Sequence, residues 1–190
     1  MNRRHEMQFG AECTVDGNVR FRLWAPQAPQ VILRLEDNPG KELLMKSAGE
    51  GWHELVSPEA RSGTRYRFRI NQELVPDPAS RFQPEGVHRP SEVVDPNAYD
   101  WKVGNWRGRP WDDAVIYELH VGTFSREGTY SGVEKKLDYL RELGVTAIEL
   151  MPLSSFPGER NWGYDGVLPY APARCYGPAD DLKRLIDGAQ

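Results

Sequence analysis

The sequence is poor in cysteine: only Cys13 and Cys175 occur among its 190 residues. The two lie far apart and match no metal-binding spacing, so we expect two free thiols in a reducing cytoplasm. No run of 18 apolar residues is present, so no membrane span is predicted. The basic start of the chain is followed by no apolar stretch, and therefore no secretory signal is predicted either.

A dense basic block is also missing. The chain has 24 Lys and Arg residues against 28 Asp and Glu residues, and its arginines are interspersed with acids. This distribution predicts no nucleic-acid partner. The sequence contains no phosphate-binding loop, no cluster of metal ligands and no motif for a nucleophilic Ser or Cys, so neither a metal nor a cofactor is expected.

Proline and glycine are present but unevenly distributed. They become frequent between Pro76 and Pro110, a pattern typical of a connector without regular structure. The chain therefore divides into two parts. We expect a β-sandwich over residues 1–95, a Pro- and Gly-rich connector over 96–111, and an α/β part over 112–190.

The first part contains short stretches of alternating apolar and polar residues. Residues 19–24 read VRFRLW, and residues 64–70 read TRYRFRI. A period of two over six or seven residues indicates a half-buried strand. Two more short strands near residues 30–35 and 51–56 are separated from these by turn-forming residues. The pattern favours a small antiparallel β-sandwich.

Two tryptophans, Trp24 and Trp52, fall on the predicted solvent faces of these strands. An aromatic side chain in such a place could bind a glycan. The interpretation we favour is that they cover a contact between the two parts of the chain, with the Pro-rich connector lying against that contact.

The second part has the order strand, helix, strand, long loop, helix. Residues 145–151 are nearly all apolar, as in a parallel strand covered on both faces. In the preceding helix, Ser131 and Glu134 have the spacing of a capping box, and Gly144 suits the C′ position. This order predicts the first two βα units of a (β/α)₈ TIM barrel. Such a barrel needs about 250 residues, so we expect the chain to be the N-terminal part of a longer protein.

The long loop, from residue 152 to about 177, follows the second predicted strand, and functional residues of such barrels lie in these loops. Its two aromatics either pack within the loop or form a platform on which a sugar ring stacks, and the location favours the platform. A histidine at the end of the first strand is either a ligand-binding or a packing residue. The predicted substrate-binding residues are Tyr164, Trp162, Asp165, Asn161 and His120.

Glycoside hydrolysis needs two carboxyl groups that flank the scissile bond. Glu118, Glu149, Glu159 and Asp165 are the candidates, and no pair of them stands out as nucleophile and acid. Glu118 and Glu149 lie within strands, where a structural role is commoner, and Glu159 is expected to be a solvated loop residue. No catalytic residue and no metal ligand is therefore assigned in this chain.

Several of these stretches resemble the first third of the catalytic barrel in the α-amylase superfamily of glycoside hydrolases. They are VIYELHVGTF, LGVTAIELMPL, NWGYDGV and the later YAP and YG. The segment VPDPASRFQPEGVHRPSEVVDP, followed by WRGRPW, is similar to the malto-oligosyltrehalose trehalohydrolases in particular. The resemblance covers essentially the whole chain.

The resemblance implies a cytoplasmic, retaining glycosidase without a redox cofactor, in which an immunoglobulin-like domain precedes the barrel. Such an enzyme would release trehalose from maltooligosyltrehalose by cleaving the adjoining α-1,4 bond, and a maltooligosyltrehalose synthase would supply the substrate. The tyrosine of GYD, here Tyr164, lines the sugar subsite next to the cleaved bond in this superfamily. The catalytic Asp, Glu and second Asp lie on later strands, so residues 1–190 alone are expected to be inactive.

Two other functions stay open. A non-catalytic α-glucan-binding module would bind maltooligosaccharides through residues 1–100 alone, although the regular start of a barrel argues against it. A glycogen branching or debranching enzyme would differ by its product, because it forms or removes an α-1,6 linkage instead of releasing trehalose.

Overall fold

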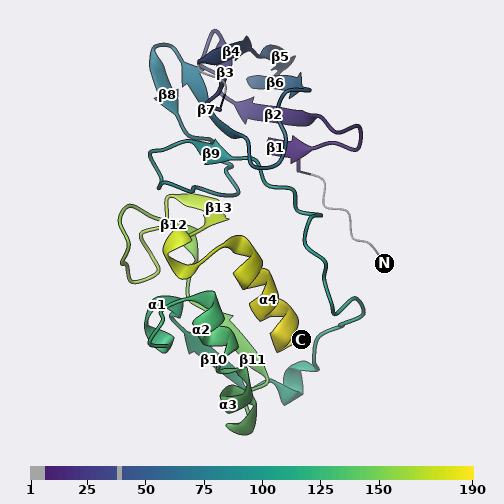
Figure 1. Cartoon of the computed structure of the whole chain (residues 1–190), viewed down its shortest axis with the longest axis vertical. Coiled ribbons are helices and arrows are strands. Elements are labelled where there is room, and N and C mark those ends of the chain that lie inside the picture. The colour runs from purple at the N-terminus through teal and green to yellow at the C-terminus, as the bar shows by residue number, and fades with distance from the viewer. Residues whose placement is uncertain (1–6, 38–39) are drawn as a thin grey trace.

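The structure of the protein is a computed structural model that describes residues 7–37 and 40–190. The first six residues of the predicted sandwich, and residues 38–39 of a predicted turn, lie outside the described residues. Figure 1 shows a β-sandwich at one end, an α/β module at the other, and the hairpin β12–β13 between them. The predicted combination of a sandwich and the start of a parallel α/β unit is confirmed.

The sandwich consists of two antiparallel sheets. One has the strand order β1-β2-β6-β5 and the other β4-β3-β7-β8, with β9 also paired to β7. The strands are β1 (Gly10–Cys13), β2 (Val19–Trp24), β3 (Val31–Leu35), β4 (Lys41–Leu44), β5 (Lys46–Gly49), β6 (Trp52–Ser57), β7 (Arg65–Ile70), β8 (Glu73–Val75) and β9 (Ser91–Glu92).

The alternating pattern read from the sequence sets which side chains fill the sandwich. Phe21 of β2, Leu33 of β3 and Phe68 of β7 are completely buried between the two sheets. The rings of Phe21 and Tyr66 meet edge to face with their centroids 4.8 Å apart. Aromatic pairs prefer this geometry. Burial of these side chains stabilises the sandwich by roughly 1.5–3 kcal/mol each.

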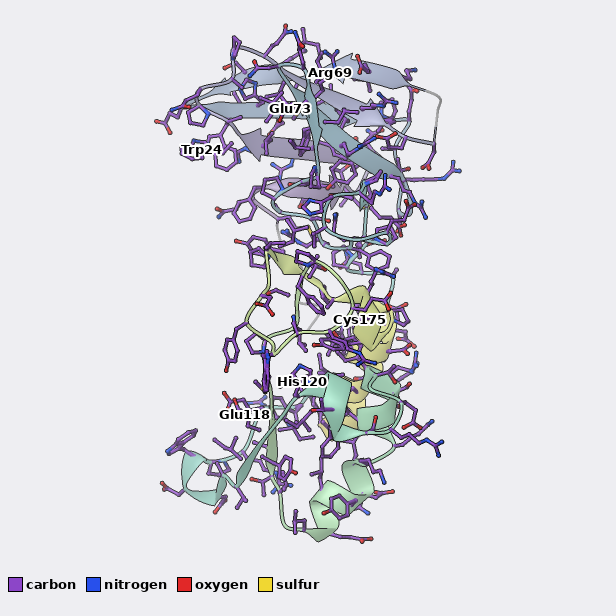
Figure 2. The ribbon with its side chains drawn as sticks, turned by 90° about the vertical axis from the view of Figure 1, so that its left-hand side faces the viewer. Trp24, Arg69, Glu73, Glu118, His120 and Cys175 are labelled. Carbon is purple, nitrogen blue, oxygen red and sulfur yellow. The ribbon has the colours of Figure 1, made fainter. Side chains whose placement is uncertain are left out.

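The contact between the sandwich and the hairpin is aromatic. Phe9 stacks against Trp52 with centroids 6.5 Å apart and meets the edge of Tyr170 at 5.5 Å. The guanidinium of Arg81 lies over the Tyr170 ring at 4.8 Å. Trp52 thus supports the predicted contact through Phe9. The prediction for Trp24 is wrong, because its side chain is 59% exposed and lies on the flank of the sandwich (Figure 2).

The Pro-rich segment between β8 and β9 also lies at this contact, as predicted. Val87 forms a small buried cluster with Leu168 and Ala171 of the hairpin. Gln83 and Gly86 of the same segment line a small cavity whose other walls include Ser155. Residues 76–90 therefore pack against both modules and do not form a free linker.

The second module pairs two parallel strands and covers them with short helices (Figure 1). Buried and partly buried side chains from the strands and helices form one cluster around Tyr130, Val133 and Leu140. Its elements are η1 (Trp111–Asp113), β10 (Ile116–Leu119), α1 (Val121–Phe124), α2 (Tyr130–Glu134), α3 (Leu137–Glu142), β11 (Ala147–Leu150), β12 (Ser154–Ser155), β13 (Leu168–Pro172), η2 (Arg174–Tyr176) and α4 (Ala179–Ala189).

The two strands are covered on one face only in this chain, since Ile116, Glu118 and Glu149 are exposed on the other. An open face is expected of two strands that belong to a longer barrel. One expectation for this module is wrong. The N-cap of the first long helical stretch is Thr129, whose Oγ1 accepts the Gly132 N–H at 3.2 Å, and not Ser131. Thr129 takes this role because it precedes the first helical turn with an extended backbone.

The end of this helical stretch is as predicted. Gly144 has φ +93°, in the left-handed region that favours glycine. Its N–H donates to the Arg141 carbonyl, and the Val145 N–H donates to the Leu140 carbonyl, each over 3.0 Å. These two bonds form a Schellman motif, which turns the chain directly into β11.

The connector runs along one side of the second module (Figure 1) and is tied to α4 by Asp187. The Asp187 carboxylate accepts the Tyr99 hydroxyl at 2.9 Å and the backbone N–H groups of Lys102 and Val103 at 3.2 and 3.3 Å. The Lys183 ammonium lies 5.3 Å from the centroid of the Tyr99 ring. In the described ranges, no helix is long and apolar enough to cross a membrane.

Replacing Asp187 by Ala is expected to release the connector from α4. Three donors lose their acceptor at once, so the chain around Lys102 should open more often. We expect trypsin to cleave after Lys102 several-fold faster than in the unchanged protein. Asp138→Ala, which removes a surface ion pair to Arg141, is the control, and equal cleavage rates in the two variants would refute the role of Asp187.

Candidate functional site

The carboxyl ends of β10 and β11 meet at the edge of the sheet that faces the β12–β13 hairpin (Figure 1). The Met151 N–H donates to the Leu119 carbonyl over 2.9 Å, which continues the pairing of the two strands to their ends. His120 follows β10 directly, and residues 151–167 follow β11. Figure 2 shows His120 at this junction.

Tyr176 of η2 connects these two chain segments. Its hydroxyl lies 3.2 Å from His120 Nε2 and 3.1 Å from Asn161 Oδ1. Asn161 Oδ1 also accepts the Gly163 N–H at 2.8 Å. Because an amide oxygen only accepts, the Tyr176 hydroxyl donates to it and its own oxygen accepts from His120 Nε2–H. The network therefore assigns His120 the Nε2–H tautomer.

The Tyr176 hydroxyl stays a donor over the physiological pH range. Its side chain is buried, and this burial raises the pKa of Tyr176 to about 12. The ring packs edge to face against His120, with centroids 5.8 Å apart, and against Tyr130 at 6.0 Å. The hydroxyl is thus held in place by a ring that has little freedom to move.

Two glycines allow this close packing. A Cβ at Gly122 would lie 2.9 Å from His120 Cε1 and 3.1 Å from Tyr176 Cε1, closer than ordinary contacts. Gly163 has φ +96°, which L-residues with a Cβ rarely adopt. Both glycines are therefore required for the arrangement of His120, Tyr176 and the loop.

The two aromatics of the loop are not part of this network. Trp162 is 84% exposed and Tyr164 is 71% exposed, and Asp165 is exposed as well. Neither ring packs within the loop, so the interpretation as a self-packed loop does not hold. Of the five predicted substrate-binding residues, the structure brings His120 and Asn161 together and displays the other three to solvent.

Sequence reasoning missed Tyr176 as a residue of this network. It stands in a YG pair directly before Pro178 and α4, where an aromatic residue is typical of a packed helix start. The hydroxyl acquires its role only through contacts with residues 15 and 56 positions away. No local pattern in the sequence reports such distant contacts.

The candidate carboxylates do not form a catalytic pair with these residues. Glu118 and Glu149 occupy the same rung of the parallel ladder, and both are exposed on the uncovered face of the sheet. Glu159 pairs with Arg174 at 3.2 Å. Within residues 7–37 and 40–190, no group of three or more His, Cys, Asp or Glu residues is arranged to hold a metal ion.

Comparison with sequence families agrees with the two modules. Residues 8–98 match carbohydrate-binding module 48, the isoamylase N-terminal domain. Residues 75–190 match the alpha-amylase catalytic domain. The overlap between the two matches, residues 75–98, contains the Pro-rich segment that packs against both modules.

Among curated proteins, the chain is similar to malto-oligosyltrehalose trehalohydrolases. That of Deinococcus radiodurans is 49% identical over 170 residues, which are 90% of this chain and 28% of the relative. That of Saccharolobus solfataricus is 45% identical over 184 residues, 96% of this chain and 32% of the relative. The chain thus spans about 30% of the length of the curated relatives it matches.

Solved structures give the same fold. A Salmonella typhimurium protein described as a candidate alpha-amylase superimposes with a TM-score of 0.92 and 49% identity, over 97% of this chain and 31% of that chain. Pullulanase type I from Bacillus subtilis, solved with maltose, superimposes with a TM-score of 0.80 and 25% identity, over 97% and 32% of the two chains. The match to the catalytic domain covers more than half of the residues of this chain, which consists of a carbohydrate-binding module 48 sandwich followed by the start of that domain. The chain therefore belongs to the α-amylase family of glycoside hydrolases.

Proposed function

We propose that this chain is the N-terminal part of a trehalohydrolase, which cleaves the α-1,4 bond next to the terminal trehalose of maltooligosyltrehalose. The observation that carries the proposal is the exposed aromatic pair Trp162 and Tyr164 at the carboxyl end of β11, in a chain 45–49% identical to two trehalohydrolases. The loop would hold a glucosyl ring by stacking, with Asp165 and the amide N–H groups of Asn161 available to its hydroxyl groups. His120 would contribute through its hydrogen bond to Tyr176.

The proposal extends to the setting of the enzyme. A maltooligosyltrehalose synthase would supply the substrate, and the reaction would take place in the cytoplasm, a location with which the free thiols of Cys13 and Cys175 are compatible. The proposed division is a sandwich over residues 1–95, a connector over 96–111 and the start of the barrel over 112–190.

A chimaera tests the assignment. Residues 1–190 are joined to the rest of the Deinococcus radiodurans relative, in place of the segment to which they are similar. We expect this chimaera to release trehalose from maltooligosyltrehalose, and residues 1–190 alone to release none, because the two carboxyl groups required for hydrolysis would come from the added part.

The relative's own complete chain is the positive control, and its remainder without the first segment is the negative one. Formation or removal of α-1,6 linkages in place of trehalose release would assign the chain to a branching or debranching enzyme. Trehalose release by residues 1–190 alone would overturn the expectation that the catalytic groups lie elsewhere.

A further inference from the structure

We propose that Tyr176 is a positioning residue whose hydroxyl fixes the loop of residues 158–167, and with it Trp162 and Tyr164, relative to the end of β10. The inference rests on the proposed function, since it gives a sugar-binding loop its anchor. Tyr176 itself need not contact the sugar. Its role is to hold Asn161, the residue directly before Trp162.

The loop has few other attachments. Residues 157–166 are all described, and none of their backbone groups bonds to another described backbone group. One side-chain link, Glu159 to Arg174, is exposed and its atoms are 3.2 Å apart, so it contributes little. Asn161 Oδ1 therefore carries the loop's main hydrogen bonds: it closes the turn to Gly163 and joins that turn to Tyr176.

The anchor itself is rigid. Tyr176 is only 4% exposed, and besides His120 and Tyr130 its ring lies beside Phe156, with centroids 6.3 Å apart. The hydroxyl extends from this packed cluster and bonds to His120, which follows β10, and to Asn161, in the loop that follows β11. A side chain fixed by packing on several sides can hold a loop residue in one orientation, which is how a binding site is preorganised.

Removing the hydroxyl alone should release the loop without disturbing the cluster. In Tyr176→Phe the ring keeps its packing, while Asn161 loses one donor and His120 Nε2–H loses its acceptor. The neighbouring Tyr130 provides a matched control. It is completely buried in the same cluster, and its hydroxyl has no hydrogen-bond partner among the described residues.

Exchange of the Gly163 amide, whose N–H donates to Asn161 Oδ1, measures the effect by NMR in the full 190-residue chain. We expect exchange of this amide to become about five-fold faster in Tyr176→Phe, the change produced by losing one ordinary hydrogen bond, and to stay unchanged in Tyr130→Phe. Equal exchange in the two variants would overturn the proposal.

A second pair of variants approaches the same bond from the loop. Asn161→Ala removes the acceptor and should accelerate exchange, whereas Asn161→Asp keeps an oxygen in its place and should restore slow exchange. Fast exchange in both would mean that the loop depends on the amide for another reason, and the role of Tyr176 would be refuted.

Titration with maltohexaose separates this proposal from the proposed function. Weaker binding by Tyr176→Phe, together with faster exchange, supports both. If the unchanged chain binds no maltohexaose but exchange still accelerates in Tyr176→Phe, the anchor stands and the sugar-binding role of the loop fails. If binding occurs and neither exchange nor affinity changes in Tyr176→Phe, the anchor fails and the sugar-binding role stands.

Discussion

Asp77→Ala is expected to lower the free energy of unfolding of the sandwich by about 3 kcal/mol, because it leaves a buried hydroxyl and a buried N–H without their acceptor. Asp77 is completely buried. Its Oδ2 accepts the Tyr66 hydroxyl at 2.6 Å and its Oδ1 accepts the Ala79 N–H at 2.8 Å. Urea unfolding followed by circular dichroism measures the difference.

Asp95→Ala is a matched control. The Asp95 carboxylate closes the same kind of turn, since Oδ1 accepts the Asn97 N–H at 2.9 Å, but it has no buried hydroxyl to satisfy. We expect a loss below about 1 kcal/mol for this variant. Losses of similar size in the two variants would show that the turn, and not the buried bond to Tyr66, accounts for the effect of Asp77.

The same carboxyl group predicts a dependence on pH. Burial raises the pKa of Asp77 above its ordinary value of 3.8, although the bonds from Tyr66 and Ala79 and the charge of Arg81 oppose this. A raised pKa means that the folded state binds the Asp77 proton more tightly than the unfolded state does. The stabilisation that this provides is therefore complete below pH 3.8 and is lost as the pH rises through the folded-state pKa of Asp77. The stability advantage of the unchanged protein over Asp77→Asn should therefore shrink as the pH rises from 3.8 through the folded-state pKa of Asp77.

The sandwich could be predicted from the sequence because the pattern that specifies each strand lies within the strand itself. A strand with one buried face must alternate, and the sides assigned to Phe21 and Phe68 are those that the structure shows. The function of Trp24 and Trp52 could not be read in the same way. They are directly opposite in the β2–β6 ladder, yet only Trp52 has Phe9 beside it, and that neighbour comes from the N-terminal segment and not from a strand pattern.

The second module was predicted less completely, because part of its structure depends on contacts between segments that are distant in sequence. The order of strands and helices follows from periodicity and from Gly144, but the hairpin β12–β13 inside the long loop does not. Its pairing is irregular and two residues long on one side, so it has no readable period. Which face of β10 and β11 is covered depends on the helices that pack there, and an apolar run such as residues 145–151 does not specify this.

The candidate site shows where sequence reasoning reaches its limit. The position of the long loop after β11 marked the correct region, because strand ends in parallel α/β units are a general location for binding residues. The hydrogen-bond chain from His120 through Tyr176 to Asn161 requires three segments that are distant in sequence. The chemical types of the residues therefore identified His120 and Asn161, but not Tyr176, which joins them.

Replacing both Trp162 and Tyr164 by Ala is expected to weaken maltohexaose binding to the 190-residue chain by about 100-fold, since each aromatic anchor typically contributes about tenfold or more. Both rings are exposed at the end of β11 and are free to stack on the apolar face of a sugar. Isothermal titration calorimetry with the two single variants and the double variant gives the contribution of each ring.

Trp24→Ala decides between the two modules as the location of this binding. Trp24 is also largely exposed, at 59%, but it lies on β2 of the sandwich, far along the chain from the loop. If the loop binds the glucan, Trp24→Ala leaves the affinity unchanged while the double variant loses it. If Trp24→Ala abolishes binding and the loop variants do not, the sandwich is the glucan-binding element, and the exposed aromatics of residues 161–165 must serve another purpose.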